Sequence, residues 1–129
     1  MISLPPSIRV FLHSPPTDLR KGFDALSGLV TTDFSQDPTS GHLFLFVNRR
    51  RDRLKILYWD RDGLAIWYKR LETPGRFQVP VIAPDALSVE MSATQLSLIL
   101  SGIDLRSARQ RKRFRRPMPQ ADKSVSSPL

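Results

Sequence analysis

The chain has 129 residues, of which 40% are hydrophobic and 25% charged, and this fits one domain with a single core and leaves no room for a second. It contains no cysteine, which excludes disulfides, a thiolate zinc site and a cysteine nucleophile. No apolar run approaches the roughly 18 residues that a membrane span needs, so we expect a soluble, cytoplasmic protein without a membrane partner.

The formal net charge of +8 is concentrated near one end of the chain. Residues 106–129 contain eight basic residues against one acid, Asp122, and so carry +7, which leaves +1 for residues 1–105. Pro117 and Pro119 interrupt any helix there, and the residues that follow are rich in serine. We predict a nearly neutral folded domain, residues 1–105, and a basic tail, residues 106–129, that is disordered on its own.

The first third of the chain predicts one strand and one helix. Ile8–Leu12 is a short run with β-branched and aromatic residues that ends before two prolines, which is typical of a strand. Thr17 then has the side chain of a helix N-cap, and apolar residues follow it at helical spacing. These are Leu19, Phe23, Leu26 and Val30. Residues 31–41 are rich in Asp, Ser, Thr, Pro and Gly, and they predict a loop.

Three strands are predicted next, at Leu43–Val47, Leu54–Trp59 and Leu64–Leu71. The connections between them are six and four residues long, and connections this short force antiparallel neighbours. Apolar side chains occupy both alternating sets of positions in the middle strand. That pattern is typical of a strand covered on both faces.

The remaining part predicts an edge strand and a second helix. Phe77–Ile82 has strand-forming residues but contains Pro80, which a sheet tolerates at its edge. Ser92 and Gln95 have the spacing of a capping box, and an apolar face follows them until Gly102. That face consists of Leu96, Ile99, Leu100 and Ile103. Together the elements predict an α+β fold, a single small domain with an antiparallel β-meander packed with two helices.

Five blocks of the sequence resemble the small accessory protein that bacterial insertion sequences of the sixty-six family encode beside their transposase. In order, the blocks are Thr17–Asp24, Asp37–Phe44, Asn48–Lys55, Tyr58–Asp60 and Tyr68–Glu72. Several blocks in a fixed order are more specific than any single motif. The resemblance extends from about Leu4 to Arg106 and does not include the basic tail.

The resemblance implies an accessory role in DNA transposition, with the transposase of the same element as a partner. In this family the transposase carries the acidic catalytic residues, so the resemblance implies a non-catalytic chain, and we expect no cofactor and no metal. Two alternatives stay open. One is a protein–protein bridging module without direct DNA binding, marked by an exposed apolar edge near Phe77–Ile82. The other is a metal-dependent nuclease that uses Asp60 and Asp62.

The connection Asn48–Arg53, which we call the arginine turn, carries the first candidate site. Guanidinium groups bind phosphate in a bidentate manner, and each neutralised phosphate releases counterions, so a hairpin end with several arginines suits a DNA backbone. The DNA-binding candidates in and near it are Arg49, Arg50, Arg51, Arg53, Lys55 and Arg61. The alternative is a solvated turn that keeps the hairpin soluble, with Asp52 in a local ion pair.

The basic tail carries the second candidate site. Its DNA-binding candidates are Arg106, Arg109, Arg111, Lys112, Arg113, Arg115 and Arg116. Basic arms bind phosphate without reading the base sequence, so we expect the tail to add largely nonspecific affinity for DNA. A solubilising tail and a contact for an acidic protein are the alternatives.

Aromatic side chains in the predicted strands form a third group. They are Phe44, Tyr58, Trp59, Trp67 and Tyr68. Exposed aromatics on a sheet can stack with single-stranded bases. Aromatics that alternate along strands more often pack against a helix, so we expect most of these rings in the core.

Overall fold

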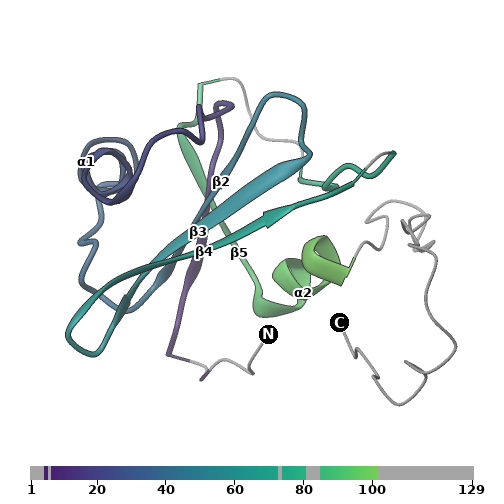
Figure 1. Ribbon diagram of the computed structural model, residues 1–129. Coiled ribbons are helices and arrows are strands. Elements are labelled where there is room, and N and C mark those ends of the chain that lie inside the picture. The colour runs from purple at the N-terminus through teal and green to yellow at the C-terminus, as the bar shows by residue number, and fades with distance from the viewer. Residues whose placement is uncertain (1–4, 6, 73, 81–84, 102–129) are drawn as a thin grey trace, which may run out of the picture.

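Five strands form one sheet in the order β4-β3-β2-β1-β5, and one helix covers each face of it (Figure 1). The computed structural model describes residues 5, 7–72, 74–80 and 85–101, so the basic tail and its expected disorder lie outside the described residues. The strands are β1 (Val10–His13), β2 (Leu43–Val47), β3 (Arg53–Asp60), β4 (Gly63–Arg70) and β5 (Ser88–Met91), and the helices are α1 (Phe23–Asp33) and α2 (Ala93–Ser101). The predicted α+β fold is confirmed.

The strands β2, β3 and β4 form the predicted antiparallel meander. The pairing of β3 with β4 runs from Arg53 opposite Arg70 to Asp60 opposite Gly63. The strand β1 joins the other side of β2 in parallel, because α1 lies in the connection between them and carries the chain back to the same end. Antiparallel pairing of β5 with β1 completes a mixed sheet.

The side chains of β3 alternate between two hydrophobic clusters on opposite faces of the sheet. Leu54 and Ile56 are fully buried together with Leu96 of α2. Leu57 is fully buried on the other face, together with Leu26 of α1. The prediction that the middle strand of the meander is covered on both faces is confirmed.

The first helix begins later than predicted. Its N-cap is Gly22, which makes no side-chain hydrogen bond, and Phe23 is its first residue. Thr17 is not a cap, because its hydroxyl lies 2.9 Å from the imidazole Nδ1 of His13 and its backbone N–H donates to Val47. Leu19 is buried in the core without belonging to the helix. The predicted apolar face is therefore correct at Leu26 and Val30, and wrong at Phe23, which is exposed.

The predicted edge strand at Phe77–Ile82 is wrong. Residues 77–80 have no regular secondary structure, while residues 81 and 82 lie outside the described part. Phe77 inserts its ring into the core on the α2 face and is only 1% exposed. The edge of the sheet beside β1 is formed by β5, a short strand that the sequence did not reveal, and its Glu90 forms an ion pair with Arg9.

The second helix confirms its capping box. The backbone N–H of Gln95 donates to the Ser92 hydroxyl at 3.1 Å, and the Gln95 side chain accepts from the Ser92 N–H at 2.9 Å. Leu96 and Ile99 are buried as expected, whereas the expected stop at Gly102 lies outside the described residues. Neither described helix is long and apolar enough to cross a membrane.

Candidate nucleic-acid interface

The arginine turn is fixed by one side chain, that of Asn48. Its amide oxygen accepts hydrogen bonds from the backbone N–H groups of Asp52 and Arg53, both at 3.1 Å. Its amide nitrogen donates to the Asp52 carboxylate at 2.7 Å. A single partly buried side chain therefore closes the turn from inside and leaves the arginine side chains to point outward.

The segment that follows β4 supports the same turn from behind. The backbone N–H of Leu71 donates to the Asp52 carbonyl at 2.7 Å, and that of Phe77 donates to the Arg51 carbonyl at 2.6 Å. Arg51 adopts a left-handed backbone conformation with φ of 60°, which residues other than glycine rarely adopt. Because the surrounding contacts hold this conformation, the turn presents its guanidinium groups in a preformed arrangement.

All four guanidinium groups of the turn lack an ion pair with a carboxylate in the described part of the chain: Arg49, Arg50, Arg51 and Arg53. The expected ion pair of Asp52 is wrong, because that carboxylate accepts from Asn48 and no ion pair to an arginine is found among the described residues. Asp52 therefore makes no direct ion pair with the arginines of the turn, although its charge helps to raise the pKa of Arg53.

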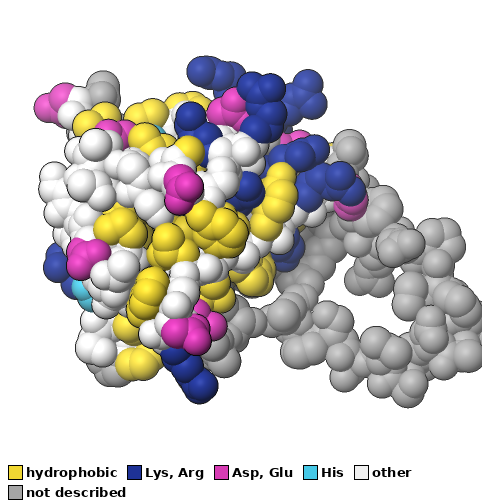
Figure 2. Space-filling model, turned by 60° about the vertical axis from the view of Figure 1, so that its left-hand side comes forward, with side chains coloured by type: hydrophobic (Ala, Val, Ile, Leu, Met, Phe, Trp, Pro, Cys, Tyr) yellow, Lys and Arg dark blue, Asp and Glu magenta, His cyan; other side chains and the backbone are white. Residues whose placement is uncertain are grey.

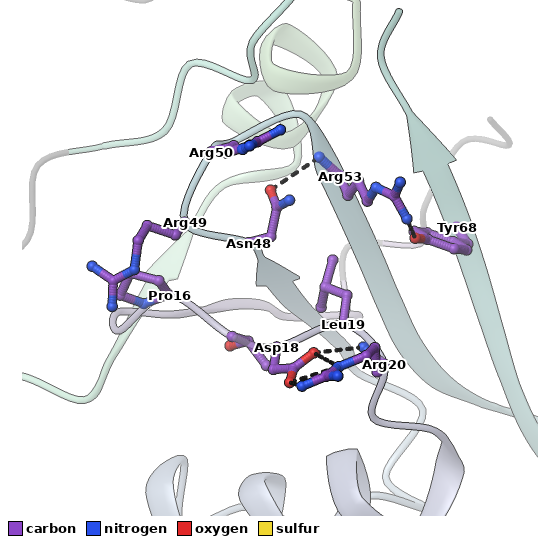
Figure 3. A pocket seen from close by; sticks show the side chains of 10 residues that line it. Pro16, Asp18, Leu19, Arg20, Asn48, Arg49, Arg50, Arg53 and Tyr68 are labelled. Carbon is purple, nitrogen blue, oxygen red and sulfur yellow. Dashed lines mark hydrogen bonds and ion pairs between the residues drawn. The ribbon is translucent and has the colours of Figure 1, made fainter.

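A cavity of about 910 Å³ opens between the arginine turn and the segment that follows β1 (Figure 3). Four arginines line it: Arg20, Arg49, Arg50 and Arg53. Asp18 is the one carboxylate among the lining residues. Figure 2 shows Lys and Arg side chains gathered at one end of the molecule, while the neighbouring surface is apolar or mixed. The cavity therefore has the electrostatic character of an anion site.

The Asp18 carboxylate forms an ion pair with only one of the four arginines of the cavity, Arg20. Its carboxylate accepts from the Arg20 Nη2 at 2.7 Å and from Nε at 3.0 Å, in addition to the Arg20 backbone N–H. These hydrogen bonds lower the pKa of Asp18 to about 2, and the same pair raises the pKa of Arg20. Arg49, Arg50 and Arg53 remain as the net positive charge of the cavity.

Cross-strand pairing adds further cations beside the cavity. Arg53 stands directly opposite Arg70 across the β3–β4 ladder, and like charges in this position repel one another. Glu72 pairs with Arg70 at 3.0 Å, and the Tyr68 hydroxyl accepts from Arg53 at 3.1 Å. Lys55 lies opposite Tyr68 on the same face. The Tyr68 hydroxyl, together with the charges of Asp52 and Glu72, raises the pKa of Arg53, so these contacts offset the repulsion.

Two basic residues near the turn in the sequence do not line the cavity, namely Arg61 and Lys69. Arg61 sits in the β3–β4 turn at the other end of β3, roughly 25 Å from Arg53 at about 3.3 Å per strand residue. Lys69 points to the opposite face of the sheet, where its ammonium donates to the Leu100 carbonyl at 3.4 Å. The structure therefore groups Arg49, Arg50, Arg53 and Lys55 and separates Arg61 from them. The seven tail candidates lie outside the described residues.

A buried polar network of His13, Thr17 and Asp33 lies next to the cavity, and no sequence pattern predicted it. The His13 ring is 6% exposed, and its Nε2 lies 2.8 Å from the Asp33 carboxylate while its Nδ1 lies 2.9 Å from the Thr17 hydroxyl. The hydrogen bond from His13 is the main cause that lowers the pKa of Asp33. Thr17 also lines the cavity, so this network fixes one wall of it to α1.

The two acids of the nuclease alternative, Asp60 and Asp62, do not line the cavity. Asp60 ends β3 and Asp62 follows in the β3–β4 turn, where the Asp62 N–H donates to the Asp60 carbonyl. Within the part of the chain that the structure describes, no three His, Asp or Glu side chains come together as a metal site.

Comparison with known proteins gives consistent matches over most of the chain. A family model described as "IS66 Orf2 like protein" matches residues 8–110. "Uncharacterized protein y4jC" of Sinorhizobium fredii is 35% identical over 117 residues, which cover 91% of this chain and 97% of that protein. "Uncharacterized protein y4hO" of the same organism is 37% identical over 100 residues, covering 78% and 84%. No solved structure matches the chain.

Proposed function

The chain belongs to the IS66 Orf2-like family, whose members have an accessory role associated with transposition, and from this premise we propose that it is a non-catalytic factor that binds the DNA phosphate backbone. The arginine turn supplies the main contact of the folded domain. In this role the protein holds DNA without altering it, and catalysis belongs to the transposase of the same element.

One observation carries this proposal: the four guanidinium groups of a turn fixed by Asn48 form no ion pair with a carboxylate among the described residues. Arginine forms paired hydrogen bonds with phosphate, and a turn that is already fixed loses little conformational entropy when it binds. Arg53 and Lys55 extend the same positive surface along β3. The arrangement suits a line of phosphates better than a single base edge, so we expect little sequence preference.

The basic tail strengthens the same contact. Its seven candidates between residues 106 and 116 provide a dense positive charge that binds phosphate through counterion release. We propose that the tail sets most of the nonspecific affinity and that the arginine turn positions the domain on the backbone.

The test is DNA affinity across a salt series, for the full chain and for a chain that ends at Leu105, on duplexes with the ends of the element and on scrambled duplexes. The slope of log K against log salt should be steep for the full chain and shallower for the shortened chain, since each neutralised phosphate contributes about −0.9 to it. The two kinds of duplex should bind alike. Affinity that ignores salt, or no binding by either chain, contradicts the proposal.

A second candidate function, protein bridging, has one observation in its favour. The strand β4 has eight residues and lies at the edge of the sheet, with β3 as its only neighbour among the described strands. Such an edge can accept a strand from a partner, for which the transposase is the candidate. A complex with purified transposase that persists at salt concentrations that release DNA would support bridging.

A nuclease function has its own test. Incubation of the protein with duplex DNA and magnesium or manganese should leave the DNA intact. Cleavage that is lost in Asp60→Asn or Asp62→Asn would contradict the non-catalytic role.

A further inference from the structure

One aromatic ring at the cavity is exposed although most rings of the sheet are not. Phe44 is fully buried, and Tyr58 and Trp67 pack against the core, whereas Tyr68 is 47% exposed. Tyr68 lies on the edge strand β4 and lines the cavity that the arginine turn borders. Figure 3 shows its ring at one side of the cavity, with Arg50 and Arg49 extending from the turn on the other.

Two contacts hold the Tyr68 ring in place. Its hydroxyl accepts a hydrogen bond from the Arg53 Nη1 at 3.1 Å. The Lys55 ammonium lies 4.9 Å from the ring centroid, within the range of a cation–π contact, and is itself anchored on the Lys21 carbonyl at 2.9 Å. The ring is therefore held in orientation with the Lys55 ammonium over one of its faces, so a base can stack only on the other face.

An exposed, fixed aromatic ring beside arginines is the combination that binds single-stranded nucleic acid. Arginines hold the phosphates, and a ring face stacks with a base of any identity. The faces of a base in a duplex are covered by its neighbours in the stack, so such a ring can reach only an unpaired base. The cavity of about 910 Å³ lies within the size range of ligand sites, roughly 300–1,000 Å³.

We propose that Tyr68 is a stacking platform for an unpaired DNA base whose adjacent phosphates are bound by Arg49 and Arg50. This inference rests on the proposed phosphate binding and adds a substrate class to it, single-stranded or frayed DNA. Tyr68 contributes affinity through the base, and the arginine turn contributes affinity through the backbone. The two contributions respond differently to salt, because stacking displaces no condensed counterions.

The experiment compares two single-stranded ligands of equal length on the full chain: a thymidine oligonucleotide and an abasic oligonucleotide with the same number of phosphates. The full chain should bind the thymidine strand about 5- to 150-fold more tightly, which is the range expected for stacking of one base. Tyr68→Leu should remove this difference, and Tyr68→Phe, which keeps the ring, should retain most of it. Tyr68→Leu should shift the affinity at every salt concentration and leave the salt slope unchanged.

The ligand comparison on the unaltered protein needs no variant, so a folding defect of Tyr68→Leu does not prevent the test. Equal binding of the thymidine and abasic strands overturns the inference and leaves the proposed phosphate binding intact. Binding to duplex DNA without binding to single strands also overturns the inference and leaves the proposed phosphate binding intact. No binding to duplex or single-stranded DNA overturns both proposals.

Discussion

The imidazole of His13 lies 2.8 Å from the carboxylate of Asp33, and this contact joins the last residue of β1 to the last residue of α1. The ring of His13 also packs on Phe34 and Phe46, with centroids 5.5 Å away in both cases. A buried polar group destabilises the fold unless it is hydrogen-bonded, and here both ring nitrogens of His13 have a partner. The pair therefore fixes α1 against the sheet on the side of the cavity.

The Asp33 carboxylate should make the stability of the protein depend on pH. Its pKa is lowered mainly by the hydrogen bond with His13, so the ionised form stabilises the fold above the ordinary pKa, and this contribution is lost as the pH falls through the lowered value. Asp33→Asn should lower the free energy of unfolding at pH 7 by about 1 kcal/mol, and the difference should shrink below about pH 4. Urea denaturation at a series of pH values measures it.

Asp24→Asn serves as the control for this prediction, because Asp24 is an exposed acid of the same helix. That variant should keep the acid sensitivity of the unaltered protein. A stability difference for Asp33→Asn that stays constant between pH 7 and pH 3 would show that the carboxylate charge plays no part.

The shape of the arginine turn should depend on Asn48. Asn48→Ala removes two acceptor contacts and one donor contact, and it should lower the free energy of unfolding by about 1–3 kcal/mol. DNA affinity should fall as well, although no charge is removed. Asp52→Asn is the matched variant, because it removes a charge and keeps an oxygen for the Asn48 amide, so stability should change little. Unaltered stability of Asn48→Ala would mean that backbone contacts alone form the turn.

The parts of the fold that the sequence predicted correctly depend on local signals. The capping box joins residues three apart, and the meander has short connections and period-two apolar patterns. The strand β5 has four residues, including the charged Glu90, and its partner β1 lies more than 70 residues away in the chain. No local pattern marks such a strand. The apolar residues around Phe77 favour a strand locally, whereas the ring is buried from an irregular segment in a cluster that includes β1, β2 and α2.

The candidate site was predictable where its residues are consecutive. Arg49 and Arg50 are adjacent in the sequence and both line the cavity, whereas the next residue, Arg51, lines a different cavity. Arg20 and Tyr68 join the cavity only because the sheet brings the segment after β1 and the strand β4 beside the turn. Arg61 is only eight residues from Arg53 in the sequence, but the eight-residue strand β3 between the two turns places them at opposite ends of that strand.

The position of Phe77 in the core should be visible in stability. Phe77→Ala should cost about 3–5 kcal/mol, as expected for an aromatic ring removed from a core. Phe77→Leu, which refills part of the volume, should cost much less. A cost for Phe77→Ala within about 0.5 kcal/mol of zero would fit a solvent-exposed edge position instead. Thermal or urea unfolding of the three proteins distinguishes these outcomes.

The grouping of cations should be visible in the salt dependence of DNA binding. Arg50→Gln and Arg61→Gln each remove one exposed charge from a turn at one end of β3, so they change the net charge equally. Arg50 lines the cavity and Arg61 does not. Arg50→Gln should reduce the magnitude of the salt slope on duplex DNA by about 0.9, the value for one lost phosphate contact, and Arg61→Gln should leave it unchanged.

Net charge alone predicts a different result for this pair. If the protein attracts DNA only through its total charge, the two variants should weaken binding to the same extent, because long-range attraction depends little on where one charge lies. Both variants should unfold within about 0.5 kcal/mol of the unaltered protein, since neither side chain is buried, and this excludes a folding effect. A change of slope in Arg50→Gln alone therefore identifies the arginine turn as a contact with the DNA backbone, whereas equal changes would mean that the turn is ordinary solvated surface.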